Sequence, residues 1–300
     1  MKDLIIVGAG PAGITAAVYA ARQKLDFSVI TKDIGGQAAW SGGIENYTGY
    51  QFVSGPELAK KFEEHLKQYQ FDLQEGMEAL KVERAKEGFT VKTSDGRLQA
   101  ARTLVIASGK RPRYLNVPGE KEFKNRGVTY CATCDGPLFA GKAVVVLGGG
   151  NSALDATLQM MKIARKVYLV NIHPELKGDA VMIEKVKADN RVEIINEART
   201  LEIFGDKFVK GMKIEVEGRM RELSVEGIFV EIGLIPSSEF IDFVDKNSIG
   251  EIMIDCASST SVPGVFAAGD VTNVPEKQIV IAAGEGAKAA LAAFRYLSTH

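Results

Sequence analysis

One pattern occurs twice in this chain: an apolar strand-like run, a glycine cluster and a helical stretch. At the N-terminus, the run at 4–7 leads into residues 8–13, which fit the spacing G-x-G-x-x-G, and a helical composition follows at 14–23. The run at 143–147 leads into residues 148–153, which fit the G-x-G-x-x-A variant. Glycines at this spacing permit a tight turn, close approach to a pyrophosphate, and close packing of helix on strand. The sequence therefore predicts two dinucleotide-binding folds, with a glycine turn that holds no ligand as the alternative for each.

Each expected phosphate lies at the N-terminus of the following helix, where backbone amides and the helix dipole favour negative charge. The residues expected at the two turns are Gly8, Gly10, Pro11, Ala12 and Gly13 in the first, and Gly148, Gly150, Asn151, Ser152 and Ala153 in the second.

Composition and charge exclude several classes of protein. A length of 300 residues allows about two domains. A net charge of −1, from 37 basic and 38 acidic residues, argues against a nucleic-acid binder with a generally basic surface. No apolar run reaches the roughly 18 residues of a membrane span, and the strand-like run at the N-terminus leaves no room for a signal peptide. We expect a soluble cytoplasmic protein without nucleic-acid or membrane partners.

The rest of the chain suggests how the two folds are arranged. Residues 194–228 alternate apolar and polar side chains, as in a β meander. The polar, proline-containing segment 110–113 suits a linker, and 233–238 suits a second crossing between domains. We predict an α/β protein whose domains are residues 1–113 with 239–300, and residues 114–238. Periodicity alone would equally allow two tandem domains.

Cys131 and Cys134 form a C-x-x-C pair that ends 14 residues before the second glycine cluster. Zinc would need two further ligands, but Cys256 stands alone and the three histidines are scattered. A structural disulfide that closes so short a loop would constrain little of the unfolded chain, and it is unusual in a reducing cytosol. The pair is best explained as a redox-active dithiol with no metal bound.

Asp135 directly follows the pair. Its carboxyl could carry a proton between thiol and thiolate, or it could cap the local turn. Cys256 follows a strand-like run, and we expect it to pack as a small hydrophobic residue.

The segment 170–177 stands where the second fold should select its ribose. It contains no arginine, Asn171 can hydrogen-bond a hydroxyl, and Glu175 would repel a 2′-phosphate. A protonated His173, or Lys177, would accommodate a phosphate instead. We predict NADH in preference to NADPH.

In the first fold, the corresponding strand ends at Thr31, with Asp33 two residues beyond, and either could reach a ribose. Asp270 follows an apolar run and Gly269. It could accept a hydrogen bond from a bound nucleotide, or it could be a helix N-cap.

With its motifs in this order, the chain resembles the low-molecular-weight thioredoxin reductases, class II pyridine nucleotide-disulfide oxidoreductases, over essentially its whole length. The likeness rests on residues 8–13, 131–137, 148–153 and 264–270. Residues 130–156, 227–236 and 265–296 look closest to the reductase portion of the flavoprotein subunit of alkyl hydroperoxide reductase. That flavoprotein is NADH-linked and has an extra N-terminal thioredoxin-like region. Because this chain begins at the first glycine cluster, a separate small dithiol protein is expected to accept the electrons.

The resemblance implies two Rossmann-like dinucleotide-binding domains of the three-layer ββα type, one inserted into the other. It implies FAD in the outer domain, a nicotinamide nucleotide in the inserted one, a homodimer, and a domain rotation. Further cofactor contacts are expected from Thr31, Gly36, Gln37, Asn46, Gly109, Asn171, Gly269, Asp270, Gln278 and Ile279.

The implied reaction passes electrons from NADH through FAD and the Cys131–Cys134 pair to a thioredoxin- or glutaredoxin-like protein. Cys134 resembles the thiol that meets the flavin, Cys131 the one that attacks the partner's disulfide, and Asp135 the proton donor. Two alternatives remain: a reductase supplied by ferredoxin or another donor, and a non-catalytic flavin redox sensor.

Overall fold

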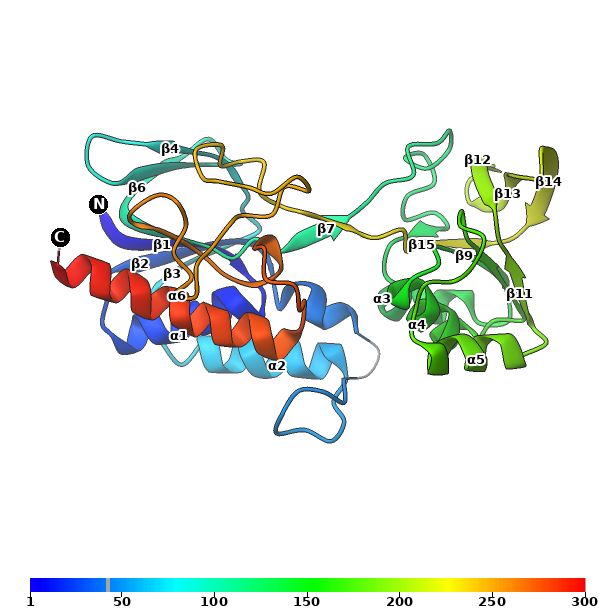
Figure 1. Cartoon of the computed structure of the whole chain (residues 1–300), viewed down its shortest axis with the longest axis horizontal. Helices are drawn as coiled ribbons and strands as arrows, with labels where there is room; N and C mark the ends of the chain where they lie inside the picture. The colour runs from blue at the N-terminus through cyan, green and yellow to red at the C-terminus, as the bar shows by residue number, and fades with distance from the viewer. Residues whose placement is uncertain (42–43, 300) are drawn as a thin grey trace. The chain divides into compact units, whose positions relative to one another are not determined.

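The chain folds into two compact units, one of which interrupts the other in sequence (Figure 1). The computed structural model describes residues 1–41 and 44–299, apart from the side chains of residues 40 and 134. The first unit combines Met1–Arg111 with Ile235–His300, and the second is Pro112–Leu234. The predicted α/β class, with one Rossmann-like unit inserted into another, is confirmed. The cofactor of each unit stays a prediction.

The first unit is built on a sheet in the order β3-β2-β1-β6-β5-β4, with β17 also paired to β6. Strands β2 and β6 flank β1 and run parallel to it, whereas β4, β5 and β6 form an antiparallel meander. The strands are β1 (Lys2–Ala9), β2 (Phe27–Ile34), β3 (Asp72–Glu75), β4 (Ala79–Arg84), β5 (Phe89–Thr93), β6 (Leu98–Ile106) and β17 (Val265–Ala267). The helices are α1 (Pro11–Arg22), α2 (Gly55–Leu66) and α6 (Ile279–Thr299), with 3₁₀ turns η1 (Gly36–Trp40) and η3 (Gly269–Val271).

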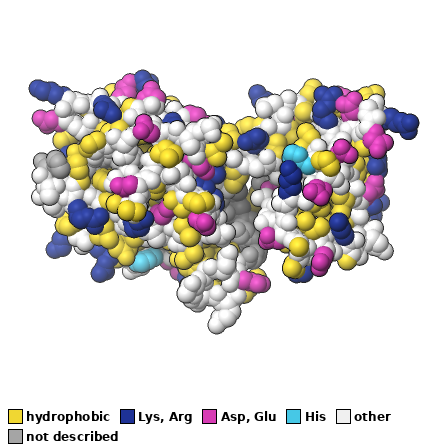
Figure 2. All heavy atoms as spheres, in the orientation of Figure 1, with side chains coloured by type: hydrophobic (Ala, Val, Ile, Leu, Met, Phe, Trp, Pro, Cys, Tyr) yellow, Lys and Arg dark blue, Asp and Glu magenta, His cyan; other side chains and the backbone are white. Residues whose placement is uncertain are grey.

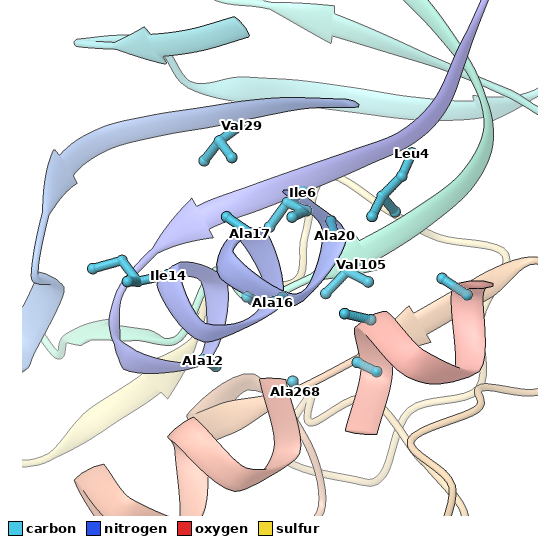
Figure 3. Packing of buried hydrophobic residues seen from close by; sticks show 14 of the residues in the cluster. Leu4, Ile6, Ala12, Ile14, Ala16, Ala17, Ala20, Val29, Val105 and Ala268 are labelled. Carbon is cyan, nitrogen blue, oxygen red and sulfur yellow. The ribbon is translucent and has the colours of Figure 1, made fainter. Parts of the chain in front are cut away.

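Small residues let α1 and α6 pack closely on one face of this sheet. Figure 3 shows Ala17 of α1 beside Ile6 of β1, in a core that α6 completes. A Cβ on Gly286 of α6 would lie 2.0 Å from the carbonyl oxygen of Ala12 in α1, so this approach requires glycine. On the opposite face, side chains of β1, β2 and β6 form a second core with those of β4, β5 and the segment 241–265.

The second unit has a parallel sheet in the order β11-β10-β9-β15-β8 and a separate antiparallel meander, β12-β13-β14. Alternate side chains of β9 serve two cores: Val144 and Val146 pack toward α4, and Val145 and Leu147 toward the meander. The strands are β8 (Val128–Thr129), β9 (Ala143–Leu147), β10 (Lys166–Val170), β11 (Val192–Ile195), β12 (Ala198–Gly205), β13 (Val209–Val216), β14 (Arg219–Ser224) and β15 (Gly227–Val230). The helices are α3 (Ala132–Asp135), α4 (Asn151–Met160) and α5 (Ala180–Ala188), with the 3₁₀ turn η2 (Gly136–Phe139).

The predicted linker at 110–113 lies where the chain passes from one unit to the other, but it is not irregular. Lys110–Pro112 forms strand β7, which pairs with β16 (Leu234–Pro236) at the return crossing. The Ser237 N–H also donates to the Gly109 carbonyl oxygen at 2.9 Å. Both strands of a two-stranded ribbon are edges, and edge strands tolerate proline.

Charged side chains of both signs are interspersed over the face drawn in Figure 2, as the net charge of −1 leads us to expect. Some form exposed pairs, such as Arg199 with Glu215. In the part of the chain that the structure describes, no helix has the length and apolar character needed to cross a bilayer.

Candidate functional site

The first glycine turn joins β1 to α1, and backbone atoms pack tightly against two of its glycines. Gly8 has a φ of +102°, and a Cβ there would lie 2.3 Å from the Ala107 carbonyl oxygen. A Cβ on Gly13 would lie 1.9 Å from the Gly8 carbonyl oxygen, so α1 packs directly on the end of β1. A Cβ on Gly10, by contrast, would meet nothing within 4 Å. The turn is open where this motif admits a pyrophosphate.

The N-terminus of α1 provides the donors for such a group. Gly10 is the N-cap and has no side chain to cap the helix, and Pro11 takes the first helical position. Backbone N–H groups in a first turn have no acceptor within the helix, and the helix dipole favours an anion there. The residues present therefore fit the pyrophosphate of a dinucleotide such as the predicted FAD.

Two distant segments converge on this turn. Gly36 lies against Gly10, since its Cβ would be 3.2 Å from the Gly10 Cα. Gly269 lies against α1, since its Cβ would be 3.0 Å from the Ala12 Cβ. The Gly269 N–H donates to Glu285 Oε2 of α6 at 2.8 Å. Burial raises the pKa of Glu285, and this hydrogen bond opposes the rise. No local sequence pattern marked Glu285 as the anchor of this segment.

Other residues expected at the flavin are hydrogen-bonded to one another or to nearby backbone. Asn46 Nδ2 donates to Gln278 Oε1 at 3.0 Å across 232 positions of sequence, and Ile279 then begins α6. Gln37 Nε2 donates to the Lys110 carbonyl oxygen at 2.9 Å. The fold thus joins the early polar loop to the C-terminal helix and to the end of the first segment.

Thr31 uses its hydroxyl within the sheet. It accepts from the Ala9 N–H at 3.1 Å, donates to the Asp33 carbonyl oxygen at 2.6 Å, and is 5% exposed. Of the two residues considered for the ribose, Asp33 is the exposed one. Gly109, with a φ of +63°, has open space at its Cβ position.

A cluster of charges lies near Asp270, one of the residues predicted to contact the flavin nucleotide. Lys110 Nζ and Lys277 Nζ lie 3.1 and 3.0 Å from Glu251 Oε1. Burial raises the pKa of Glu251, but hydrogen bonds from Asn247 and both lysines outweigh that effect and lower it. Burial also raises the pKa of Asp270, which the two lysines oppose. Glu251 was missed because it stands 141 residues from Lys110.

The second glycine turn, between β9 and α4, repeats the steric plan of the first. Gly148 has a φ of +136°, and its Cβ would lie 2.2 Å from the Glu231 carbonyl oxygen and 3.0 Å from the Ala153 Cβ. A Cβ on Gly150 would again meet nothing within 4 Å. Gly150 is the N-cap of α4 and has no side-chain cap. The residues fit a second dinucleotide pyrophosphate.

Asn171, the predicted ribose contact, is bound to its own loop. Its Nδ2 donates to the carbonyl oxygens of His173 and Glu175 at 3.0 and 2.8 Å, and lies 3.2 Å from Asn196 Oδ1. Its Oδ1 accepts from the His173 N–H at 3.2 Å, and the residue is 1% exposed. The side chain therefore shapes the loop, and Glu175 is one of the exposed residues on it.

That loop is fastened to the glycine turn. The Lys177 N–H donates to the Gly149 carbonyl oxygen at 2.7 Å, and the Asp179 N–H donates to Asn151 Oδ1 at 2.8 Å. Asn151 and Ser152 are exposed at the start of α4. Residues 171–179 thus border the opening at the second turn.

The dithiol segment follows β8. Cys131 is disulfide-bonded, while the side chain of Cys134 lies outside the described part of the structure. The Cys131 N–H donates to Thr129 Oγ1 at 3.2 Å, and that hydroxyl donates to Asp135 Oδ2. The Asp135 N–H donates to the Cys131 carbonyl oxygen at 3.2 Å. Asp135 is therefore tied to Cys131 through two routes.

Cys256 does not pack in the core. It is a free thiol and is exposed, so the expectation that it packs as a buried hydrophobic residue is wrong. Among residues 1–41 and 44–299, no cluster of three or more His, Cys, Asp or Glu could hold a metal ion.

Glu231 is a half-buried acid at the second turn that the sequence did not single out. It follows β15, and its carbonyl oxygen is the wall against which Gly148 packs. Burial raises the pKa of Glu231 to about 8, and the Asp155 carboxylate contributes to the rise. At neutral pH this carboxyl keeps its proton.

Comparison with known proteins places these features in a family. The model of the pyridine nucleotide-disulphide oxidoreductases matches residues 2–286. The F subunit of alkyl hydroperoxide reductase from Pseudomonas putida is 44% identical over 98% of this chain. NADH dehydrogenase of Bacillus subtilis (strain 168) is 42% identical over 98% of it. The chain spans 58% of the length of each of these two relatives.

A solved structure shows the same architecture over the full chain. Thioredoxin reductase of Lactococcus lactis superposes with a TM-score of 0.91 and 32% sequence identity, covering 100% of both chains.

Substitutions at Gly10 and Gly13 should separate binding from folding. We expect Gly13→Ala to destabilise the protein by about 1–3 kcal/mol, because its methyl group must displace the Gly8 carbonyl. Gly10→Ala should retain wild-type stability without added dinucleotide but weaken FAD binding at least about tenfold. Thermal unfolding and flavin titration measure the two effects. Equal destabilisation by both substitutions would contradict the assignment of Gly13 to packing and Gly10 to dinucleotide binding.

Replacing Glu231 with Gln should stabilise the protein increasingly as the pH rises. Because the folded-state pKa is about 8 against an ordinary 4.5, the folded carboxyl keeps a proton that the unfolded chain has lost between these values. The stability from neutral Glu231 is therefore present below pH 4.5 and is lost as the pH rises through about 8. Between about pH 6 and 9, the melting temperature of E231Q relative to wild type should rise by at least about 2 °C. Replacing the exposed Glu184 with Gln should change the melting temperature by an amount that does not vary with pH. A pH-independent difference for E231Q would refute the raised pKa of Glu231.

Proposed function

Because the chain belongs to the pyridine nucleotide-disulphide oxidoreductase family, we propose that it is a flavin-dependent disulfide reductase of the thioredoxin reductase type. The observation that carries the proposal is the recurrence of one steric plan. At Gly8 and Gly148 the turn packs against a carbonyl oxygen, whereas at Gly10 and Gly150 the Cβ position has open space. A disulfide-bonded Cys131 precedes the second turn. One chain then has places for two dinucleotides and a dithiol.

We assign FAD to the first unit and the nicotinamide nucleotide to the second. The first turn gathers Gly36 and Gly269 around it, and the cluster of Lys110, Glu251 and Lys277 adds charge near Asp270. A bound flavin supplies two-electron transfer between a nicotinamide and a disulfide. The chain's own residues hold the dinucleotides and carry out the thiol chemistry.

The dithiol transfers electrons by two displacements. The thiolate of Cys131 attacks the partner's disulfide, forming a mixed disulfide and releasing one partner thiolate. The thiolate of Cys134 then attacks Cys131 Sγ, so that the internal disulfide forms and the second partner thiolate leaves. Two electrons pass to the partner, and its two thiolates take up the two protons that the dithiol loses. Asp135 is assigned to move protons in these steps.

The loop at 171–177 supports NADH as the donor. It contains no arginine for a 2′-phosphate, and the exposed Glu175 would repel one. The exposed His173 and Lys177 are its basic side chains, and the Lys177 N–H is hydrogen-bonded to the glycine turn.

The acceptor that fits this chemistry is a small thioredoxin- or glutaredoxin-like protein in the cytoplasm. Such an acceptor carries a disulfide that the Cys131 thiolate can attack. We also propose that the protein is a homodimer. A rotation of the two domains of each chain would present the dithiol first to the flavin and then to the acceptor.

Anaerobic titration of the FAD-bound protein, together with steady-state kinetics, tests which nucleotide is the electron donor. NADH should bleach the flavin absorbance, and its kcat/KM should exceed that of NADPH at least about tenfold, because a phosphate would meet Glu175 rather than an arginine. A higher kcat/KM for NADPH would refute the preference. No bleaching by either nucleotide would point to ferredoxin or another donor.

Cysteine substitutions test the dithiol. Cys131→Ser and Cys134→Ser should each reduce turnover of a thioredoxin-like disulfide by at least about 10³-fold, because the first removes the attacking thiol and the second removes the thiol that resolves the mixed disulfide. Both variants should retain FAD and be bleached by NADH. Cys256→Ser, which alters an exposed thiol, serves as the matched control and should keep wild-type turnover. Normal acceptor reduction by either active-site variant would remove the dithiol from the pathway.

A further inference from the structure

Thr129 lies between the dithiol and its neighbouring acid. It is the last residue of β8, it pairs with Phe229 of β15, and it is 5% exposed. Its Oγ1 accepts the Cys131 N–H at 3.2 Å and donates to Asp135 Oδ2. The backbone of Thr129 is thus held by the sheet while its side chain spans the start of the dithiol segment.

The direction of these hydrogen bonds follows from the donors available. A peptide N–H can only donate, so the bond from Cys131 occupies a lone pair of the hydroxyl. The hydroxyl proton is then directed to the Asp135 carboxyl. The Asp135 N–H, which donates to the Cys131 carbonyl oxygen at 3.2 Å, closes the arrangement.

We propose that Thr129 is a positioning residue that holds the Asp135 carboxyl in place for proton transfer during reduction of the acceptor disulfide. The inference rests on the proposed function. Thr129 touches neither acceptor nor cofactor in this role, and it acts through Asp135. When the mixed disulfide is resolved, the Asp135 carboxylate takes the proton of the attacking Cys134 thiol and passes it to the departing partner thiolate. Loss of the Thr129 hydroxyl removes the hydrogen bond that holds the carboxyl in place for this transfer.

A neighbouring threonine shows that this contact is specific to one hydroxyl. Thr133 lies within the C-x-x-C pair, but its Oγ1 donates to Gln159 Oε1 of α4 at 2.9 Å. Thr133→Val therefore removes a hydroxyl from the same short segment without touching the Asp135 contact. It provides the matched control.

Other titratable groups lie on the elements around the dithiol segment or next to them. Asp155 of α4 accepts from Gln159 Nε2 at 2.8 Å, and the Tyr130 hydroxyl donates to Glu120 Oε1 at 2.8 Å. Glu231 follows β15. The pH dependence of kcat is also measured for E231Q, so that any contribution of Glu231 to it is identified.

The experiment measures acceptor reduction against pH in the FAD-bound protein, with saturating NADH and a thioredoxin disulfide as the probe. Thr129→Val and Thr129→Ala should lower kcat about tenfold at neutral pH and alter its pH dependence, because the carboxyl is no longer held for proton transfer. Thr129→Ser keeps the hydroxyl and should restore both. Thr133→Val should keep the wild-type kcat and pH dependence. The alanine variant adds no bulk, so it replaces the valine variant if the latter does not fold.

The outcomes separate this inference from the proposed function. Bleaching of the flavin by NADH should be the same in wild type and all Thr129 variants, because the hydroxyl acts after flavin reduction. A wild type that bleaches with NADH but reduces no thioredoxin disulfide refutes the proposed function. A wild type that turns over, alongside Thr129→Ala with the same rate and pH profile, overturns the role of Thr129. An equal change in Thr133→Val also overturns it, because the effect would then belong to the segment as a whole.

Discussion

The contact between a glycine and a facing carbonyl oxygen at each βα turn is the constraint on which both nucleotide sites depend. At Gly13, a methyl group would fall 1.9 Å from the Gly8 carbonyl oxygen, so a side chain there would push α1 away from β1. At Gly148, a methyl group would fall 2.2 Å from the carbonyl oxygen of Glu231, which follows the neighbouring strand β15. Close packing places the helix N-terminus at the carboxyl end of the strand, where its amides face the ligand position. The open space at Gly10 and Gly150 lies beside these donors.

The first site also depends on the return of the chain after the inserted unit. Helix α6 packs on α1 through Gly286, and Glu285 on the same helix holds the Gly269 N–H at 2.8 Å. Lys277 reaches Glu251 just before α6 begins. The paired strands β7 and β16 keep the two crossing segments together, so an insertion in the sequence need not disturb the sheet that it interrupts.

Several polar groups at the sites are already engaged with the protein, and this changes what they can do. Thr31 and Asn171 were attractive as ribose contacts, yet each spends its hydrogen-bonding groups on neighbouring backbone. These bonds fix the backbone around each side chain, and the role of either residue as a ribose contact stays a prediction. Asp135 is likewise engaged, through Thr129, but its partner is a hydroxyl that leaves the carboxyl able to exchange a proton.

The sequence by itself determined the two turns and the dithiol, because the chemistry of each is encoded by residues only a few positions apart. Glycines at fixed spacing after an apolar run identify a βα turn, and two cysteines separated by two residues identify a possible disulfide. Only the tertiary structure decided the partners of Glu251, Glu285 and Glu231, because each meets atoms that distant segments bring to it. It also left Cys256 exposed, although the apolar run before that residue indicated burial. Burial and hydrogen-bond partnership depend on what the rest of the chain places nearby, and no local pattern records that.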